Sequence, residues 1–191
     1  MKHATSRLLF AYWDRLRGER SAPERSEIKP GDIRQILADT FILGARADGS
    51  AAFRLAGTRC AALFGQDLKD TPFAALWALD RGAEAASLLD PVLGESTPVV
   101  AGLIGVNADG VRLALELLIL PLHHNGSTNA RAIGTLSPAH LPSWIGLVPI
   151  TGLELQSLRV IGTVPKPVGP PPPPPVAQGR RRFSVVPGGR T

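Results

Sequence analysis

Residues 53–77, FRLAGTRCAALFGQDLKDTPFAALW, constrain the fold more than any other part of the chain. They are predicted to contain a short strand, a turn, a helix, a loop and a second short helix. We expect Gly65 to end the first helix, because glycine adopts the left-handed conformation at a helix C-terminus without steric cost. Thr71 and Pro72 are the predicted cap and first residue of the second helix. The segments on either side are expected to supply a helical cap and the rest of a sheet.

Apolar and alternating runs predict the strands of that sheet. They cover residues 40–46, 51–55, 97–106, 111–122 and 131–137, with one further extended segment at 153–161. Asp48-Gly49 and Asp109-Gly110 are hairpin turn signals, so we expect antiparallel pairs. The runs at 97–106 and 111–122 are almost continuously apolar, which indicates that both faces of these strands are covered. A longer helix is predicted over residues 80–93.

An amphipathic helix is predicted over residues 4–17, where apolar residues recur at helical spacing. The stripe consists of Leu9, Tyr12, Trp13 and Leu16. Such a stripe must pack against apolar surface. It either covers the chain's own sheet, which we favour, or forms the contact of a homodimer.

The charge is distributed unevenly along the chain. The net charge is +5, but residues 41–160 hold 8 basic and 10 acidic side chains, and residues 161–191 hold 5 basic and none acidic. The basic character therefore belongs mainly to the tail, where prolines at 170–175 predict a polyproline II spacer within a largely disordered segment. Nucleic-acid binding through this tail is retained as an alternative function. We consider it the weaker one, because the three arginines at 180–182 are too few for stable binding at physiological salt.

The cellular setting is predicted from three features. Cys60 is the single cysteine, so no disulfide framework forms and a reducing compartment is expected. The first residues lack the pattern of a signal peptide, and no apolar run reaches the about 20 residues that a membrane helix requires. We therefore expect a cytoplasmic protein that does not enter a membrane.

The order of the elements resembles that of a PAS domain, and the motifs resemble the single-domain PAS proteins of alphaproteobacteria. The matching residues are Tyr12, Trp13, Asp14, Arg15, Leu16, Arg17, Gly18, Arg20, Pro23, Arg25, Pro30, Asp32 and Ile33, then Arg54, Gly57 and Thr58, then Phe64, Gly65, Asp67 and Leu68. The chain departs from the pattern at Asp70-Thr71, where a glycine is usual. The resemblance implies an α+β fold, with an antiparallel sheet of about five strands, flanking short helices and an N-terminal helix.

The expected organisation has three parts. Residues 1–39 form an N-terminal helical cap and connector, residues 40–162 a PAS-like domain, and residues 163–191 a Pro-rich, basic, disordered tail. The resemblance implies a sensory or regulatory module and not an enzyme. Its expected partners are a small ligand or a signalling protein, with homodimerisation through the N-terminal helix as a further alternative. No cofactor can be assigned from the sequence.

The resemblance places a ligand between the sheet and its flanking helices, which makes Phe53, Cys60, Phe73 and Trp77 the pocket candidates. Cys60 does not match the photoreactive cysteine of flavin-binding relatives, which lies in the region of Thr71 here, so we interpret it as a buried core residue. A ligand sensor predicts a roomy apolar cavity near these four residues. An adaptor predicts a filled core and an exposed aromatic patch on residues 8–16.

Other polar residues give no catalytic or metal-binding pattern. No nucleophile with a neighbouring base is recognisable. His123 and His124 are predicted to lie in a surface turn, and they lack the spacing of metal ligands. Arg54 and Arg59 flank the turn before the first short helix of residues 53–77. We favour ion pairs with nearby aspartates for these two residues over an anchor for an anionic ligand or a partner's carboxylate.

Overall fold

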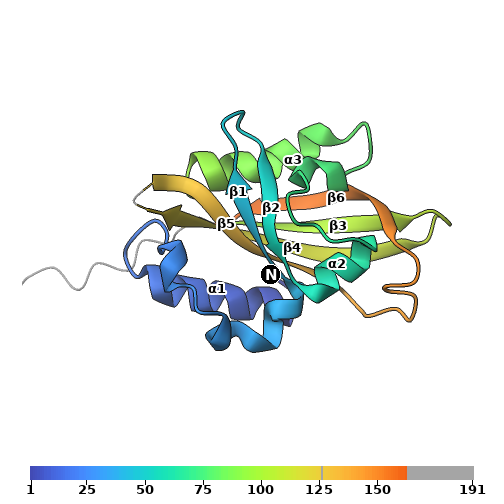
Figure 1. Ribbon diagram of the computed structural model, residues 1–191, viewed down its shortest axis with the longest axis horizontal. Helices are drawn as coiled ribbons and strands as arrows, with labels where there is room; N and C mark the ends of the chain where they lie inside the picture. Colours follow the sequence, from blue (N-terminus) through green and yellow to red (C-terminus); the bar gives the residue numbers. More distant parts are fainter. Residues whose placement is uncertain (126, 163–191) are drawn as a thin grey trace, which may run out of the picture.

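The computed structural model describes residues 1–125 and 127–162, so the predicted tail lies outside the described residues. Its centre is an antiparallel sheet of six strands in the order β2-β1-β5-β4-β3-β6 (Figure 1). The strands are β1 (Thr40–Ala45), β2 (Ala51–Ala56), β3 (Val99–Asn107), β4 (Arg112–His124), β5 (Ser127–Pro138) and β6 (Ile150–Val160). The five predicted strands are present, and the further extended segment forms the sixth strand by pairing with β3.

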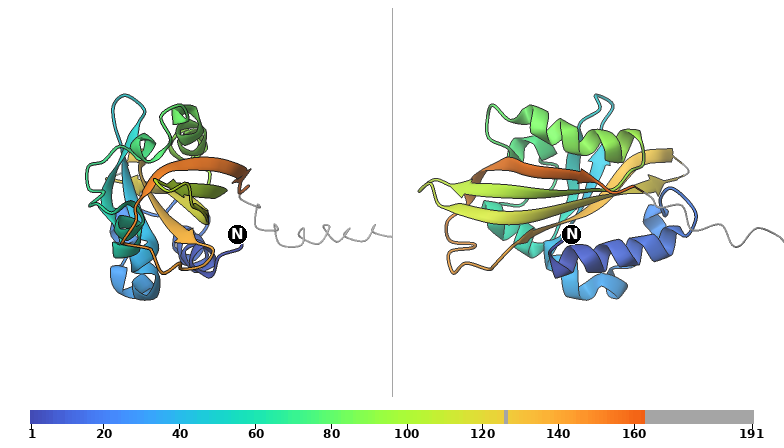
Figure 2. Two further views of the ribbon diagram at one scale, coloured as in Figure 1. Left: turned by 90° about the vertical axis from the view of Figure 1, so that its right-hand side faces the viewer. Right: turned by 180° about the vertical axis from the view of Figure 1, so that it is seen from behind.

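Helices cover both faces of this sheet, with α1 along one face and α3 across the other (Figures 1 and 2). The α-helices are α1 (Ala4–Arg17), α2 (Thr58–Phe64) and α3 (Gly82–Leu89). The other helical segments are the 3₁₀ helices η1 (Arg25–Glu27), η2 (Pro30–Asp39) and η3 (Phe73–Leu76) and the π-type turn η4 (Asp90–Gly94). The helix predicted over residues 80–93 is thus an α-helix followed by a π-type turn. Pro91 accounts for the change, because proline has no N–H to continue the α-helical ladder.

The sheet separates two apolar clusters. The inner cluster lies under α2, η3 and α3, and the outer cluster lies under α1 and η2. β4 contributes side chains to both clusters. Leu113, Leu115 and Leu117 belong to the inner cluster, and Leu118 and Leu120 belong to the outer one. Side chains of a strand alternate between faces, so a strand buried on both sides needs an almost continuous apolar run. β4 is buried on both faces from Leu117 to Leu122, as its sequence predicts, whereas Ala114 nearer its start is exposed.

The apolar stripe of α1 packs on the chain's own sheet. Leu9, Tyr12 and Trp13 are buried in the outer cluster, and Leu16 packs partly buried against it. The Trp13 indole N–H donates to the carbonyl of Pro121 of β4 at 2.8 Å, which fixes the helix to the sheet. The expectation of an exposed aromatic patch on residues 8–16 is wrong for this reason. A dimer contact through these four side chains would require α1 to leave the sheet.

For the two short helices, α2 and η3, the observed ends lie within about one residue of the ends predicted from the sequence. Gly65 ends α2 in the left-handed conformation, with φ of 63°, as predicted. Gly57 is the N-cap residue of α2. The N-cap residue of η3 is Pro72, one residue after the predicted Thr71. η2 begins at Pro30, because proline is favoured in the first turn of a helix.

Candidate functional site

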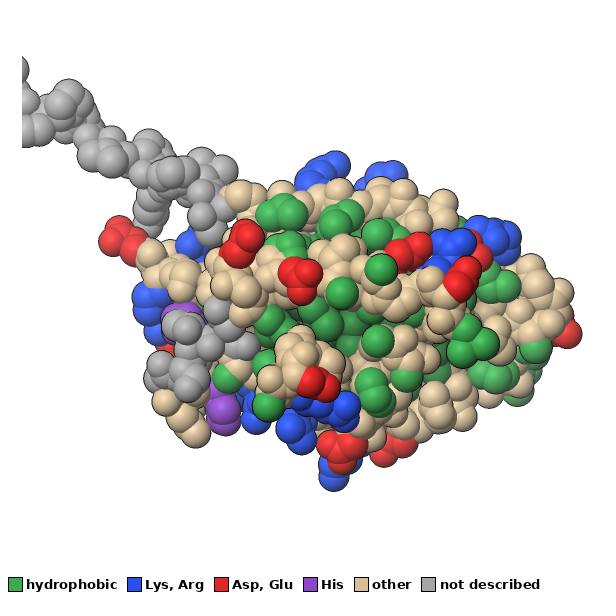
Figure 3. Space-filling model, turned by 90° about the horizontal axis from the view of Figure 1, so that it is seen from above, with side chains coloured by type: hydrophobic (Ala, Val, Ile, Leu, Met, Phe, Trp, Pro, Cys, Tyr) green, Lys and Arg blue, Asp and Glu red, His purple; other side chains and the backbone are tan. Residues whose placement is uncertain are grey.

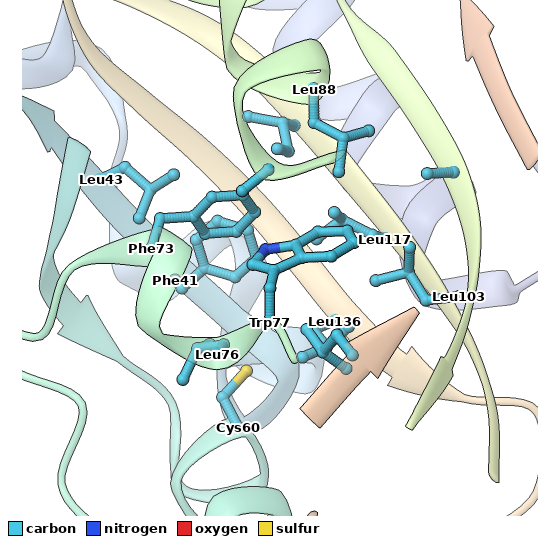
Figure 4. Packing of buried hydrophobic residues seen from close by; sticks show 14 of the residues in the cluster. Phe41, Leu43, Cys60, Phe73, Leu76, Trp77, Leu88, Leu103, Leu117 and Leu136 are labelled. Carbon is cyan, nitrogen blue, oxygen red and sulfur yellow. The ribbon is translucent and has the colours of Figure 1, made fainter. Parts of the chain in front are cut away.

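The four predicted pocket residues belong to the inner cluster, in or beside one aromatic row. Figure 4 shows Cys60, Phe73 and Trp77 of this group together with Phe41. The ring centroids of Phe41 and Phe53 are 5.5 Å apart, those of Phe53 and Phe73 are 6.0 Å apart, and those of Phe73 and Trp77 are 6.1 Å apart. Two of these contacts are edge-to-face, a favourable arrangement for aromatic rings. Phe53, Cys60, Phe73 and Trp77 are each at most 4% exposed. The structure therefore brings the candidates together, and their rings pack directly against one another.

The chain around η3 is attached to both edges of the sheet. On one side, the Phe53 N–H of β2 donates to the Thr71 carbonyl at 3.0 Å, and the Asp70 N–H donates back to the Phe53 carbonyl at 2.8 Å. On the other side, Trp77 forms a bridge with Leu153 of β6. The segment from Asp70 to Trp77 thus spans the inner face from one edge strand to the other. These contacts hold Phe73 and Trp77 over the sheet.

Cys60 is a core residue that faces away from solvent. It is 1% exposed, and burial, followed by the nearby Asp39 carboxylate, raises the pKa of its thiol to about 12. The thiolate is the nucleophilic form of cysteine, so this thiol is unreactive in the folded protein. The environment is that of a small packed apolar side chain.

We expect Cys60 to resist alkylation until the protein unfolds. In the native protein at pH 8, the rate with iodoacetamide should fall far below that of a free cysteine, because the thiol is both buried and protonated. In denaturing urea the same thiol should react at the ordinary rate, which provides the internal control. Mass spectrometry of quenched samples measures the fraction modified. Rapid labelling of the native protein would contradict the packing described.

Trp77 carries a buried polar atom without a partner. Its indole N–H is shielded from solvent and has no hydrogen-bond acceptor in the described residues. Leaving a buried donor unpaired costs about 1–3 kcal/mol. This N–H is the polar group of the aromatic row that could contact a ligand.

The two predicted arginines form ion pairs of different character. Arg59 of α2 binds Asp39, whose side chain is buried at the end of η2. Arg54 lies 3.4 Å from Asp70, and both of these side chains are largely exposed. The Arg54 pair is therefore weak, whereas the Arg59 pair joins two elements around a buried carboxylate. Sequence analysis missed Asp39, because nothing in its local pattern indicates that the fold buries it.

Among the described residues, no group of three His, Cys, Asp or Glu side chains is placed to hold a metal ion. His123 and His124 end β4, so the predicted surface turn is wrong for them. The pairing of this strand with β5 extends as far as His124. His123 is 3.2 Å from the Ser21 hydroxyl, and His3 caps α1 by accepting from the Thr5 N–H.

A groove of about 550 Å³ lies on the outer face of the sheet, away from the aromatic row. Residues 1–3 form one wall, and β3, β4 and β6 form the rest. Val100, Ile104 and Ala114 contribute apolar surface, and Lys2 and Arg159 contribute positive charge. Glu116 also lines the groove, and its carboxylate accepts from the backbone N–H groups of Lys2 and His3. The sensor hypothesis predicted a cavity beside Phe53 and Trp77, and this groove is at a different place.

Comparison with known proteins gives the family. A family model described as a PAS domain matches residues 1–137, which is most of the chain. The match includes the N-terminal helix, so the predicted cap is part of the family's pattern, and β6 lies beyond it. The chain belongs to the PAS domain family and has its α+β fold. Membership of this family defines a sensory or regulatory module.

This chain is similar to a solved structure of a light-oxygen-voltage domain, whose mechanism was studied with a flavin analogue. It is 14% identical, with a TM-score of 0.44, and the similarity covers 58% of this chain and 83% of that chain. A search of curated proteins gave no match. Within the described residues, no helix is long and apolar enough to cross a membrane.

Proposed function

We propose that this protein is a regulatory module of cytoplasmic signalling that acts by binding a partner protein. The observation that carries the proposal is the aromatic row, whose buried rings pack against one another in the inner cluster. In a PAS domain that holds a small molecule between the sheet and its helices, that space must be open, and here Phe41, Phe53, Phe73 and Trp77 occupy it. A filled core leaves the protein surface as the part that can carry the signal.

The outer groove is the surface that suits a partner best. Its floor is apolar, which favours a segment with exposed apolar side chains, and Lys2 and Arg159 at its rim favour acidic residues on that segment. The groove also lies beside the start of α1, so a bound partner would contact both the sheet and the N-terminal helix.

The test uses a variant that fills the groove. Ala114 is exposed on β4, so Ala114→Trp places a large side chain in the groove without disturbing the core. The full chain serves to capture a partner from its host, and the complex is then rebuilt from two purified proteins. We expect Ala114→Trp to weaken this binary complex by about tenfold or more in calorimetry. The matched control is Ala11→Trp, on an exposed position of α1, which should not change the affinity.

Either of two results would contradict the proposal. One is that no partner binds the purified protein directly. The other is that Ala114→Trp and Ala11→Trp affect the complex equally, which would remove the groove as the binding surface.

A second candidate function is a small-ligand sensor, and the unpaired indole N–H of Trp77 favours it. A ligand that enters the inner cluster could accept this hydrogen bond and recover its cost. Such a ligand would have to displace part of the aromatic row. This candidate predicts a bound small molecule that depends on Trp77.

The alternative of nucleic-acid binding depends on the basic tail, which lies outside the described residues. The face shown in Figure 3 carries acidic and basic side chains interspersed among apolar ones. Nucleic-acid surfaces are instead strongly and continuously positive. This face therefore gives no support to nucleic-acid binding, which as an alternative function depends on the basic tail alone.

A further inference from the structure

Two arginines lie over one glycine on the outer face of the sheet. Gly44 of β1 pairs with Arg131 of β5 on one side and neighbours the Arg54 region of β2 on the other. A Cβ atom on Gly44 would lie 2.7 Å from Arg54 Nε and 2.8 Å from Arg131 Nη1. Both side chains thus occupy the space that a larger residue would fill. The missing side chain at position 44 is what lets the two guanidinium groups approach each other.

Arg131 lies near other arginines and forms no ion pair within the described part of the chain. Burial, followed by Arg54 and Arg25, lowers the pKa of Arg131. Its one hydrogen bond within the described residues goes from Nη1 to the carbonyl of Ala130 at 3.0 Å, and no carboxylate in the described part of the chain pairs with it. Asp70 lies 3.4 Å from Arg54 and is 65% exposed, so it neutralises little of this charge.

We infer that Arg54 and Arg131 form a binding site for a phosphoryl group above Gly44. Arginine is suited to this ligand because its planar fork of N–H donors matches phosphate oxygens. A phosphoryl group carries about two negative charges and three acceptor oxygens, enough to engage more than one guanidinium. Like charges held close together repel, and a bound anion removes that repulsion. The two arginines come from β2 and β5, on either side of β1, so only the fold brings them together.

This site is separate from the outer groove and from the aromatic row, so it does not depend on the proposed function. Its ligand could be free phosphate or a phosphoryl group on a metabolite or a modified side chain. The shared chemistry is a phosphate monoester or phosphate ion. Inorganic phosphate, O-phosphoserine and a nucleoside monophosphate, used as three separate probes, distinguish these sources.

The experiment titrates each probe into the full chain in phosphate-free buffer at constant ionic strength. Heteronuclear NMR follows the arginine Nε–H signals, and sodium sulfate and sodium chloride serve as comparison salts. We expect saturable shifts of the Arg54 and Arg131 signals, and about tenfold weaker binding in Arg131→Gln. Arg131→Lys keeps the charge but loses the fork, so its affinity should fall between the two.

Two controls separate this site from other arginines. Arg34→Gln changes an exposed arginine of η2 and should leave the binding unchanged. A variant with glutamine at positions 180, 181 and 182 removes the basic run of the tail and should also retain the shifts. Thermal unfolding shows whether Arg131→Gln is folded, and in phosphate-free buffer we expect its Tm to be no lower than that of the parent, because a like-charge contact is lost.

Three results would overturn the inference. One is the absence of saturable binding by all three probes. The second is equal weakening by Arg34→Gln and Arg131→Gln, and the third is loss of the shifts when the tail arginines are removed. Binding of any one probe that depends on Arg131 supports it and identifies the source of the phosphoryl group.

Discussion

Replacing Trp13 with alanine is expected to lower the free energy of unfolding by about 3–5 kcal/mol, because it empties a large space in the outer cluster. Trp13 is fully buried, and its indole N–H donates to the Pro121 carbonyl. Its ring also lies under the Arg17 guanidinium, 5.2 Å from the ring centroid. The loss should release α1 from the sheet, since this side chain joins the helix to β4.

Urea denaturation followed by circular dichroism measures this loss, and Trp13→Phe is the matched control. Phenylalanine keeps most of the apolar volume and removes the hydrogen bond, so its cost should be clearly smaller than that of alanine. A loss below about 1 kcal/mol for Trp13→Ala would mean that α1 does not pack on the sheet in solution. In that case the stripe would again be available as a dimer contact.

The second large effect is expected at Gly57, which caps α2. A Cβ atom there would lie 2.0 Å from the Leu37 carbonyl oxygen and 2.5 Å from that of Ala38. Both obstacles are backbone atoms, and the Gly57 N–H is itself bonded to the Thr40 carbonyl at 2.8 Å, so the chain cannot easily move apart. We expect Gly57→Ala to cost about 3 kcal/mol, the upper part of the range for overpacking.

Gly31→Ala is the control for this substitution. An added Cβ at Gly31 meets no atom within 4 Å, so alanine should be tolerated there. Chemical denaturation of the two variants gives the comparison. Equal stability of Gly57→Ala and Gly31→Ala would contradict the close approach of η2 and α2. The expected result gives a physical reason for glycine in the Arg-x-x-Gly-Thr motif.

Local chemistry in the sequence predicts much of the fold. The stripe of Leu9, Tyr12 and Trp13 indicates a helix with one buried face, and that face is buried. The position of Gly65 after an apolar run predicts the left-handed end of α2, which the structure confirms. These features depend on residues close together in the chain, where periodicity and capping rules apply directly.

Features that depend on long-range packing could not be predicted in this way. The four pocket candidates do lie together, but only the three-dimensional arrangement shows that their rings fill the space between them. Asp39 and Arg59 meet across two elements, and Arg54 and Arg131 approach each other over Gly44 of the strand between them. No local pattern contains such contacts, because they depend on strand order and register.

Native mass spectrometry of the full chain purified from its own host, beside Trp77→Phe, tests the central claim most directly. Phenylalanine keeps the aromatic packing and removes the indole N–H. If the inner cluster is filled by the protein's own side chains, both proteins should have the mass of the bare polypeptide under native and denaturing conditions. A small-molecule adduct on the parent that is lost in Trp77→Phe would contradict this account and identify the protein as a ligand sensor.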